Sequence, residues 1–367
     1  MDTVDITIIG AGVIGLAIAQ KLAGTEKDLL ILEQHRSFGT ETSSRHSEVI
    51  HAGIYYPKDS LKAKFCVAGK IAMYDYCRRN RIPFKQLGKL IVATKSEEEP
   101  ILEEILGKAR TNGVFDLQWM SRQELQRLEP ELQATQALFS PSTGIIDSHS
   151  FMRSLLANAE SKGANLVCLT PVERIEPVKE GFEVHVGGEN PFHFHTRILI
   201  NAGGLYAQDI SRKISGLNPH SIPPIYFCKG NYFAISGKSP FSHLIYPVPE
   251  PNVAGLGVHS TIDLAGQVRF GPDVQYIDTI DYDVSLKNLP QFYHSIRRYF
   301  PGLPDASLRP DYSGIRPKLQ GPGDPVADFI IQDASIHQLP GLIQLYGIES
   351  PGFTSSLAIA DHVHTLL

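Results

Sequence analysis

The chain has 367 residues, of which 42% are hydrophobic and 20% charged, and its formal net charge is -5 at pH 7. This length is too great for one small core and predicts two domains or one large α/β unit. The slightly acidic balance excludes the basic surface of a nucleic-acid-binding protein, so we expect no nucleic-acid partner.

The cysteines and the N-terminus indicate a reduced, non-secreted protein. The sequence contains 4 cysteines and no CxxC pair, so we expect buried thiols rather than a disulfide scaffold. The run MDTVDITIIG has neither the basic region nor the cleavage site of a signal peptide, and no apolar run reaches the ~18 residues of a membrane span. We therefore expect a cytoplasmic protein without an integral membrane segment, and peripheral attachment to a membrane stays open.

The first predicted element is a strand followed by a glycine-rich turn and a helix. Residues 6–9 form a short apolar run, and Gly10, Gly12 and Gly15 follow in GxGxxG spacing. One glycine makes the tight turn, one lets the backbone approach a pyrophosphate, and one lets the helix pack on the strand. The N-terminus of the helix offers free N–H groups to the phosphates.

A carboxylate ends the next predicted strand. The run DLLILE closes at Glu33, 18 residues after Gly15. A carboxylate at this point can accept hydrogen bonds from the adenosine ribose and repels a 2′-phosphate. Together with the glycine motif it predicts dinucleotide binding, which NAD and FAD share.

Three later segments favour FAD. NLVCLTPVERIEPV leads into FEVHVGG as a strand excursion that can run beside an adenine, and FHTRILINAGG reads as a strand ending in glycines. GLIQLYGIESPGFTSS reads as a strand and then a helix that starts at Pro351-Gly352, whose free N–H groups can face the pyrimidine edge of a flavin. We therefore predict a discontinuous FAD-binding domain over residues 1–85, 145–225 and 311–367.

The remaining segments, 86–144 and 226–310, predict a substrate domain. KLIVAT reads as a strand, two charged amphipathic helices follow, and the second has Ser121 and Glu124 in capping-box spacing. KGNYFAIS, HLIYPVP, AGLGVHSTI and GQVRFGPDV read as successive strands. The predicted fold class is α/β (α+β), with a Rossmann-like FAD-binding domain and a substrate domain built on a mixed, largely antiparallel sheet.

Motifs along nearly the whole chain resemble the FAD-dependent L-2-hydroxyglutarate dehydrogenase/oxidase family, within the D-amino-acid oxidase and glycine oxidase class. They are GAGVIG, SSRHSEVIHAGIYY, SLKAKFCVAGK, GKLIVAT, LIYPVPEP, LGVHST and IESPGFTSS. TSSRHSEVIHAG is also similar to flavin-dependent glycerol-3-phosphate dehydrogenases. The chain departs from the family pattern at Arg45–Glu48, where His-Asn-Ser-Gly is usual, and at KGNY, residues 229–232, where Arg-Gly-Glu-Tyr is usual. It is also shorter after RFGPDV, so the exact acid stays open.

The three-part nucleotide frame and the lack of an assured covalent anchor predict noncovalent FAD. The resemblance implies that the segment after Glu33 crosses between the flavin and the substrate domain. His46 keeps a covalent link to FAD open, since a nearby histidine carries the flavin in some relatives. The expected cofactor-binding residues are Gly10, Gly12, Val13, Ile14, Gly15, Glu33, Gln34, Thr42, Ser43, Ser44, Arg45, Ser47, Val49, Gly53, Val172, Ala202, Gly203, Gly314, Arg316, Ser350, Gly352, Phe353 and Thr354.

Oxidation of a 2-hydroxy acid needs a base and a carboxylate holder. His51 and His259 are the candidate bases, with His259 favoured, and we expect the pKa of the base near the ~6.5 reference for histidine. Arg316, in SGIRPKL, is the expected carboxylate fork. Lys229 is expected to hold a distal carboxylate, to stabilise reduced flavin or to assist oxygen.

Aromatic and histidine-rich positions carry weaker predictions. Tyr55, Tyr56, Tyr232 and Tyr246 are either cavity walls or core residues. The HFH run at residues 193–195 lacks neighbouring Cys or acidic ligands, so we expect no metal.

The sequence therefore predicts a flavoenzyme that oxidises a small L-2-hydroxy acid, with L-2-hydroxyglutarate favoured. An amine oxidase acting on glycine or a D-amino acid, a glycerol-3-phosphate dehydrogenase-like enzyme and a non-enzymatic flavoprotein are the alternatives. The expected partners are a small carboxylate substrate and an electron acceptor, which can be oxygen, a quinone or an electron-transfer protein.

Overall fold

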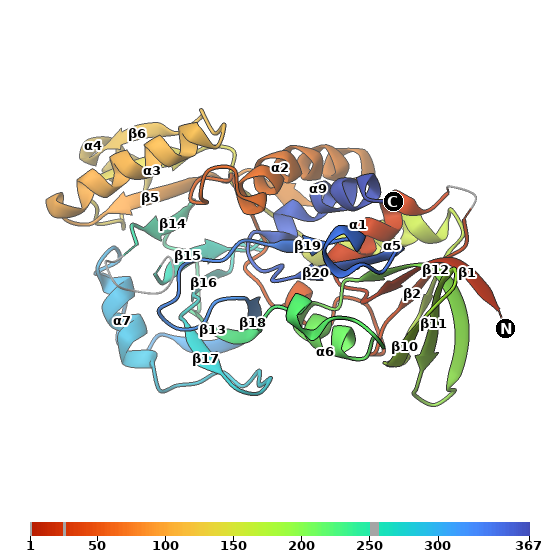
Figure 1. Cartoon of the computed structure of the whole chain (residues 1–367). Helices are drawn as coiled ribbons and strands as arrows, with labels where there is room; N and C mark the ends of the chain where they lie inside the picture. The colour runs from red at the N-terminus through yellow and green to blue at the C-terminus, as the bar shows by residue number, and fades with distance from the viewer. Residues whose placement is uncertain (1, 25–26, 250–256) are drawn as a thin grey trace.

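The computed structural model describes residues 2–24, 27–249 and 257–367, and two large β-sheets organise them (Figure 1). The helices that surround the sheets are α1 (Val13–Leu22), α2 (Leu61–Asn80), α3 (Glu99–Thr111), α4 (Arg122–Leu128), α5 (Ser148–Glu160), α6 (Ala207–Arg212), α7 (Leu289–Arg297), α8 (Ala334–His337) and α9 (Gly352–Thr365). None of the helices in these described ranges is long and apolar enough to cross a membrane.

The first sheet contains the predicted nucleotide-binding strands. Its members are β1 (Thr3–Ile9), β2 (Leu29–Leu32), β9 (Ala164–Val167), β10 (Val172–Val178), β11 (Gly181–Val186), β12 (Phe192–Asn201), β19 (Ile330–Gln332) and β20 (Leu342–Tyr346). The strands β9, β2, β1, β12 and β20 lie parallel in that order, while β19 and the β10–β11 hairpin pair antiparallel. Helices cover the parallel part of the sheet, which explains its nearly continuous apolar strands.

The register of the first sheet gathers the predicted motif at one edge. Ile9 pairs with Leu32 on one side and with Asn201 on the other. The residues that follow these strand ends, Gly10, Glu33 and Ala202, therefore leave the sheet together. A crevice outside the carboxyl ends of parallel strands is where such sheets bind ligands.

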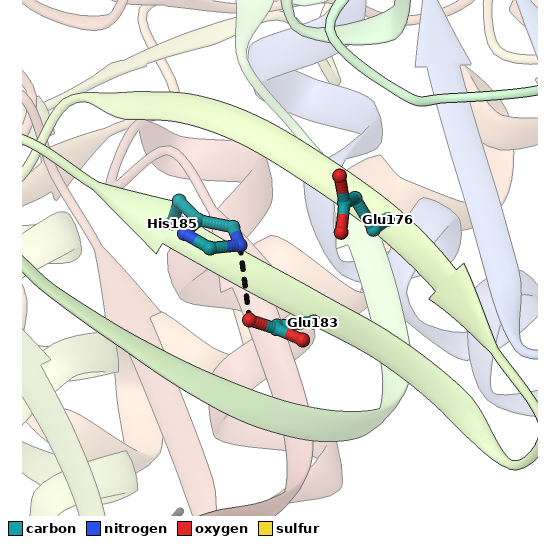
Figure 2. A group of neighbouring side chains, drawn as sticks. All are labelled: Glu176, Glu183 and His185. Atoms are coloured by element: carbon teal, nitrogen blue, oxygen red, sulfur yellow. Dashed lines mark ion pairs between the residues drawn. The ribbon is translucent and has the colours of Figure 1, made fainter.

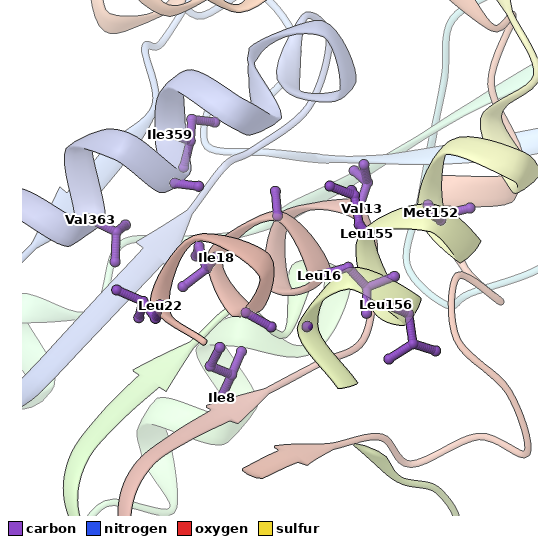
Figure 3. Packing of buried hydrophobic residues seen from close by; sticks show 14 of the residues in the cluster. Ile8, Val13, Leu16, Ile18, Leu22, Met152, Leu155, Leu156, Ile359 and Val363 are labelled. Carbon is purple, nitrogen blue, oxygen red and sulfur yellow. The ribbon is translucent and has the colours of Figure 1, made fainter. Parts of the chain in front are cut away.

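Helix α1 is packed against α5, α9 and β1, and its glycine allows the close approach to β1. Figure 3 shows Leu16 and Ile18 of α1 between Ile359 of α9 and Leu155 of α5, over Ile8 of β1. A Cβ added to Gly15 would lie 1.9 Å from the carbonyl oxygen of Gly10. Gly15 thus allows the helix to pack on its own strand, as the motif predicts.

The second sheet comes from the predicted substrate domain, except for most of β18. Its members are β5 (Lys89–Ala93), β6 (Gln118–Ser121), β7 (Gln136–Ser140), β13 (Tyr226–Ala234), β14 (Leu244–Pro247), β15 (His259–Ile262), β16 (Val268–Gly271), β17 (Gln275–Ile277) and β18 (Arg309–Lys318). Among the pairs described, only β5 with β14 is parallel. The predicted fold class is therefore confirmed. A small sheet of β3 (Val49–Ile50), β8 (Gly144–Ile146) and β4 (Phe84–Lys85) stands beside them.

Local predictions in the second region met different outcomes. The capping box at the start of α4 is present, with both the Ser121 and the Glu124 side chains bonded to the backbone of the other. The predicted start of the FAD-binding segment at residue 311 falls inside β18, which pairs along its length with β13, so β18 belongs to the second sheet. The predicted strand AGLGVHSTI lies partly outside the described residues, and β15 starts at His259.

Candidate active site

A cavity of about 1540 Å³ is lined by residues of both sheets. Pockets for one small ligand usually measure about 300–1,000 Å³, so this cavity is large enough for a dinucleotide and a small substrate. Among the predicted cofactor residues, those on its wall are Gly10, Gly12, Val13, Ile14, Glu33, Gln34, Thr42, Ser43, Arg45, Ser47, Val49, Val172, Ala202, Gly203, Gly314, Arg316, Ser350, Gly352 and Phe353.

The glycine turn makes the wall by bringing backbone close to backbone. Gly10 has φ +103, and a Cβ on it would lie 2.6 Å from the carbonyl oxygen of Ala202. A Cβ on Gly12 would lie 3.0 Å from Ser43 Oγ, which accepts the N–H of Val13 at 3.0 Å. The start of α1 thus lines the cavity with backbone, and Ser43 is the side chain that approaches it, which fits a turn that binds a pyrophosphate.

Glu33 is buried at the edge of the cavity and anchors the turn. Its two carboxylate oxygens accept the N–H groups of Ala11 and His35, each at 2.9 Å. Its exposed fraction is 7%, and it lines the cavity. This position fits a carboxylate that accepts hydrogen bonds from ribose hydroxyls.

Four of the predicted cofactor residues have structural contacts instead of cavity positions, and one of them is Gly15, which packs α1 on β1. Ser44 Oγ donates to the carbonyl oxygen of Gly39. Gly53, with φ +96, packs against helix α2, where an added Cβ would lie 2.6 Å from Val67. Thr354 Oγ1 accepts the N–H of His51 at 3.0 Å and so ties α9 to the crossing segment. Sequence spacing cannot tell which side of an irregular segment faces a ligand.

Arg45 and His46 are held by protein groups. The guanidinium of Arg45 lies 4.0 Å from the ring centroid of Tyr282, a contact that no sequence motif predicts. His46 Nε2 lies 3.0 Å from the carbonyl oxygen of Ser43, and its Nδ1 accepts the N–H of Glu48 at 3.0 Å. Since both ring nitrogens of His46 are used, the geometry fits noncovalent rather than histidine-linked FAD.

The two candidate bases both line the cavity, and both are neutral. Burial, the charge of Lys89 and the neighbouring His46 lower the pKa of His51 to about 3. Burial and the charges of Lys89, His51 and Arg316 lower the pKa of His259 well below its ordinary value. The expectation of a pKa near 6.5 is therefore wrong for both, because neither has a carboxylate neighbour to offset burial.

His259 differs from His51 in how it is held. Its ring stacks on that of Tyr246 with centroids 3.8 Å apart and planes at 6°. Its Nδ1 is buried and has no hydrogen-bond partner among the described residues. His51 Nε2 instead lies 3.5 Å from Ser350 Oγ. The buried Nδ1 of His259 is therefore available for a hydrogen bond from a ligand group.

Arg316 and Lys229 lie on opposite faces of the second sheet. Arg316 lines the cavity, with Nε donating to the carbonyl oxygen of Cys228 at 3.2 Å and Nη2 to that of Asp273 at 2.9 Å. Lys229 is buried and pairs with Asp281 at 2.7 Å. Because side chains alternate along β13, Gly230 and Tyr232 face the cavity and Lys229 faces away. The predicted catalytic role of Lys229 is thus corrected.

The structure adds buried charges that the sequence analysis missed. Glu349, on the cavity wall, accepts from Lys62 and Lys318, each at 3.0 Å. Burial alone would raise the pKa of Glu349, but Lys62, Lys318 and Arg316 together hold it below its ordinary value. Lys89 is a further buried cation, next to Tyr55 and Tyr246. Lys89 opens the otherwise apolar strand KLIVA, and the sequence analysis did not select it as a site residue. A lysine in such a run is unusual, and this was the available signal.

A cluster of possible metal ligands lies outside the cavity. Glu176, Glu183 and His185 project from the β10–β11 hairpin (Figure 2). His185 Nε2 pairs with Glu183 at 3.1 Å, while Arg174 pairs with Glu176 at 2.9 Å and approaches His185 Nε2 at 3.2 Å. The arginine already supplies the positive charge that a metal would bring, so we assign no metal here.

Comparison with known proteins places this geometry in context. Residues 5–366 match the protein family described as FAD dependent oxidoreductase. A protein of Arabidopsis thaliana named L-2-hydroxyglutarate dehydrogenase, mitochondrial, is 43% identical over 402 residues, which cover 99% of this chain and 83% of the relative.

Solved structures share the fold over the full chain. L-alpha-glycerophosphate oxidase from Mycoplasma pneumoniae with FAD bound has a TM-score of 0.88 and 25% identity, covering 100% of this chain and 95% of the other. Glycine oxidase from Geobacillus kaustophilus has a TM-score of 0.81 and 22% identity, with coverage of 100% and 95%.

Proposed function

Because the chain belongs to the family of FAD-dependent oxidoreductases, we propose that it oxidises a small L-2-hydroxy acid to the 2-oxo acid, with L-2-hydroxyglutarate as the substrate. The single observation that carries the choice of substrate is the 43% identity to the Arabidopsis dehydrogenase across 99% of the chain. The cavity adds the chemistry that such a reaction needs, namely neutral histidines and an arginine on one wall.

The residues present fit FAD. The open start of α1, the bare backbone at Gly10 and Gly12, and the buried Glu33 would hold the pyrophosphate and ribose, while the start of α9 at Gly352 would face the flavin ring. When bound, FAD supplies the acceptor for the hydride that leaves C2 of the substrate.

Arg316 holds the carboxylate in this proposal. Its Nε and Nη2 are fixed by backbone carbonyl groups, so the plane of the guanidinium is set before substrate arrives. Arg316 lines the cavity, and its Nη1 has no hydrogen-bond partner among the described residues. A planar, oriented donor of this kind binds a carboxylate with defined geometry.

A neutral histidine takes the hydroxyl proton. The lowered pKa values of His51 and His259 keep both rings unprotonated at neutral pH, which a base requires. We favour His259, because its buried Nδ1 lacks a partner among the described residues and its ring is fixed by Tyr246. His51, which also lines the cavity, would then orient the substrate.

Two alternatives can be tested in the same experiment. Glycine oxidase shares the fold, and the Mycoplasma oxidase, named for a glycerophosphate, has the higher TM-score. Purified holoenzyme should be mixed anaerobically with L-2-hydroxyglutarate, D-2-hydroxyglutarate, glycine and L-glycerol 3-phosphate while flavin absorbance is followed. We expect bleaching with L-2-hydroxyglutarate alone, and bleaching by glycine or glycerol 3-phosphate instead would overturn the proposal.

The acceptor and the compartment stay predictions. Oxygen, a quinone and an electron-transfer protein are all compatible with the proposed reaction. The expected cytoplasmic location, with peripheral membrane attachment open, also stays a prediction, and the Arabidopsis relative is named as mitochondrial.

A further inference from the structure

Three lysines are buried in the described part of the chain, and they differ in their partners. Lys62 is 3% exposed and pairs with Glu349, and Lys229 is 2% exposed and pairs with Asp281. Lys89 is 1% exposed and has neither an ion pair nor a side-chain hydrogen bond to any described residue. A buried ammonium without an anion is costly, so Lys89 requires a separate explanation.

The sheet register places Lys89 beside the catalytic wall. Lys89 of β5 pairs with Leu244 of β14, two residues before Tyr246, so Lys89 and Tyr246 project to the same face. Its Nζ lies 4.7 Å from the ring centroids of both Tyr55 and Tyr246. Both tyrosines line the cavity, and Tyr246 stacks on His259.

We propose that Lys89 binds the second carboxylate of a dicarboxylate substrate, which enters between the rings of Tyr55 and Tyr246. The inference rests on the proposed function, since L-2-hydroxyglutarate carries one carboxylate beside its hydroxyl group and another at the far end. Arg316 takes the first and Lys89 takes the second. Lys62 and Lys318 are less suited, because both already share Glu349.

The surroundings of Lys89 favour an incoming anion. The aromatic rings of Tyr55 and Tyr246 stabilise the ammonium through cation–π contacts but do not neutralise it. Burial lowers the pKa of Lys89 to about 7, with the nearby Cys66 acting in the opposite direction. A carboxylate at this place would restore the charged form, so substrate binding and protonation of Lys89 would support one another.

Binding of a compound that cannot be oxidised tests the proposal without turnover. Glutarate has both carboxylates but no hydroxyl group, and pentanoate is the same chain with one carboxylate. We expect calorimetric titration of the holoenzyme to show glutarate binding about tenfold or more tighter than pentanoate. Lys89→Met should abolish this preference while leaving pentanoate affinity and bound FAD unchanged, and Lys89→Arg should keep part of it.

Lys229→Met is the matched control, because it removes a buried lysine from another strand of the same sheet, β13, where the side chain faces away from the cavity. It should keep the full preference. A Lys89→Met variant that still prefers glutarate as strongly as the parent, or a parent without the preference, would overturn the inference. Bleaching by L-2-hydroxyglutarate is measured separately, so failure of the proposed function is recognised independently.

Proton uptake gives a second readout. At pH 8 the side chains around Lys89 are neutral, because the pKa values of Tyr55, Tyr246 and Cys66 are raised and those of His51 and His259 are lowered, in each case mainly by burial. Glutarate binding at pH 8 should therefore take up a proton in the parent and none in Lys89→Met. Calorimetry in buffers of different ionisation enthalpy measures this, and equal uptake in both proteins would contradict the assignment.

Discussion

At the nucleotide end of the cavity the wall is backbone, whereas at the substrate end it is side chains. Gly10 and Gly12 belong to one short turn, and the absence of Cβ atoms there lets Ala202 and Ser43 approach within contact distance. His259, Arg316 and Tyr246 come from three strands of the second sheet, β15, β18 and β14, and Lys89 of β5 lies behind Tyr246. The first end depends on φ angles and close approach, and the second depends on which face each strand presents.

This difference decides how each end tolerates substitution. Where the wall is backbone, a Cβ added to a glycine such as Gly10 collides with a neighbouring carbonyl group that cannot move away, and the wall is distorted. A side-chain wall keeps its fold when one member is replaced, and loses only the interaction that the member made. We therefore expect changes at the nucleotide end to cost stability and cofactor together, and changes at the substrate end to cost rate or affinity.

The largest effect is expected for Gly10→Ala. The added Cβ would lie 2.6 Å from the carbonyl oxygen of Ala202 at a residue with φ +103, so both overpacking and backbone strain oppose it. We expect loss of most bound FAD and ~1–3 kcal/mol of stability, measured by flavin absorbance per chain and by thermal melting.

Gly107→Ala is the control for this change. Gly107 lies inside α3 with no atom within 4 Å of an added Cβ, so alanine should be neutral or should stabilise by up to about 1 kcal/mol. If Gly10→Ala kept full FAD and the parent melting temperature, the backbone account of this end would fail.

The same contrast explains what the sequence could predict. The GxGxxG turn and Glu33 are local patterns whose spacing reflects a fixed geometry, and the structure brings them to one edge of the sheet. The resemblance to a known family likewise directed attention to His51, His259 and Arg316, all of which line the cavity.

The wrong predictions concern strand residues, for which the site depends on which face of the sheet a side chain projects from. Lys229 is predicted in the site because it stands where the resembled family usually has an arginine, but alternation along β13 turns it toward Asp281. Lys89 was overlooked inside an apolar strand, although its side chain lies beside Tyr246. Whether a strand residue faces the core or a ligand depends on pairing with distant strands, which a single sequence does not contain.

The next largest effect concerns the histidines of the side-chain wall. Replacing the base with alanine should slow flavin reduction by roughly 10²–10⁴-fold with FAD still bound, and replacing the other histidine should mainly weaken substrate binding. Stopped-flow reduction of His51→Ala and His259→Ala separates the two roles. Parent rates in both variants would remove the histidine-base mechanism and favour the amine oxidase alternative.

The pH dependence sharpens this test. Because the pKa of His51 is lowered to about 3 and that of His259 lies well below its ordinary value, neither ring should gain a proton as the pH falls through 6.5. Reduction at saturating substrate should therefore not decline near pH 6.5. The free energy of unfolding should decline below about pH 6.5. In this range the histidines of the unfolded chain bind protons, whereas the same buried rings in the folded protein do not. A rate that falls through pH 6.5 at constant stability would contradict the lowered values.

The smallest effect is expected for Glu33→Ala, which tests whether a side chain contributes to the backbone end. Its carboxylate holds the N–H groups of Ala11 and His35, and hydrogen bonds to a charged acceptor contribute about 1.5–3 kcal/mol each. We expect weaker FAD binding in titrations of the apo-protein, without change in the flavin's reduction potential. Glu183→Ala, on the β10–β11 hairpin outside the cavity, should bind FAD as the parent does.

Two causes of that loss can be separated with FMN, which lacks the adenosine ribose. If Glu33 acts by accepting the ribose hydroxyls, its removal weakens binding of FAD but leaves FMN binding unchanged. If Glu33 acts only by ordering the turn at Ala11, FAD and FMN weaken alike, because both place a phosphate group beyond the ribityl chain. Equal FAD affinity in Glu33→Ala and the parent would exclude both roles and leave the nucleotide end dependent on its backbone alone.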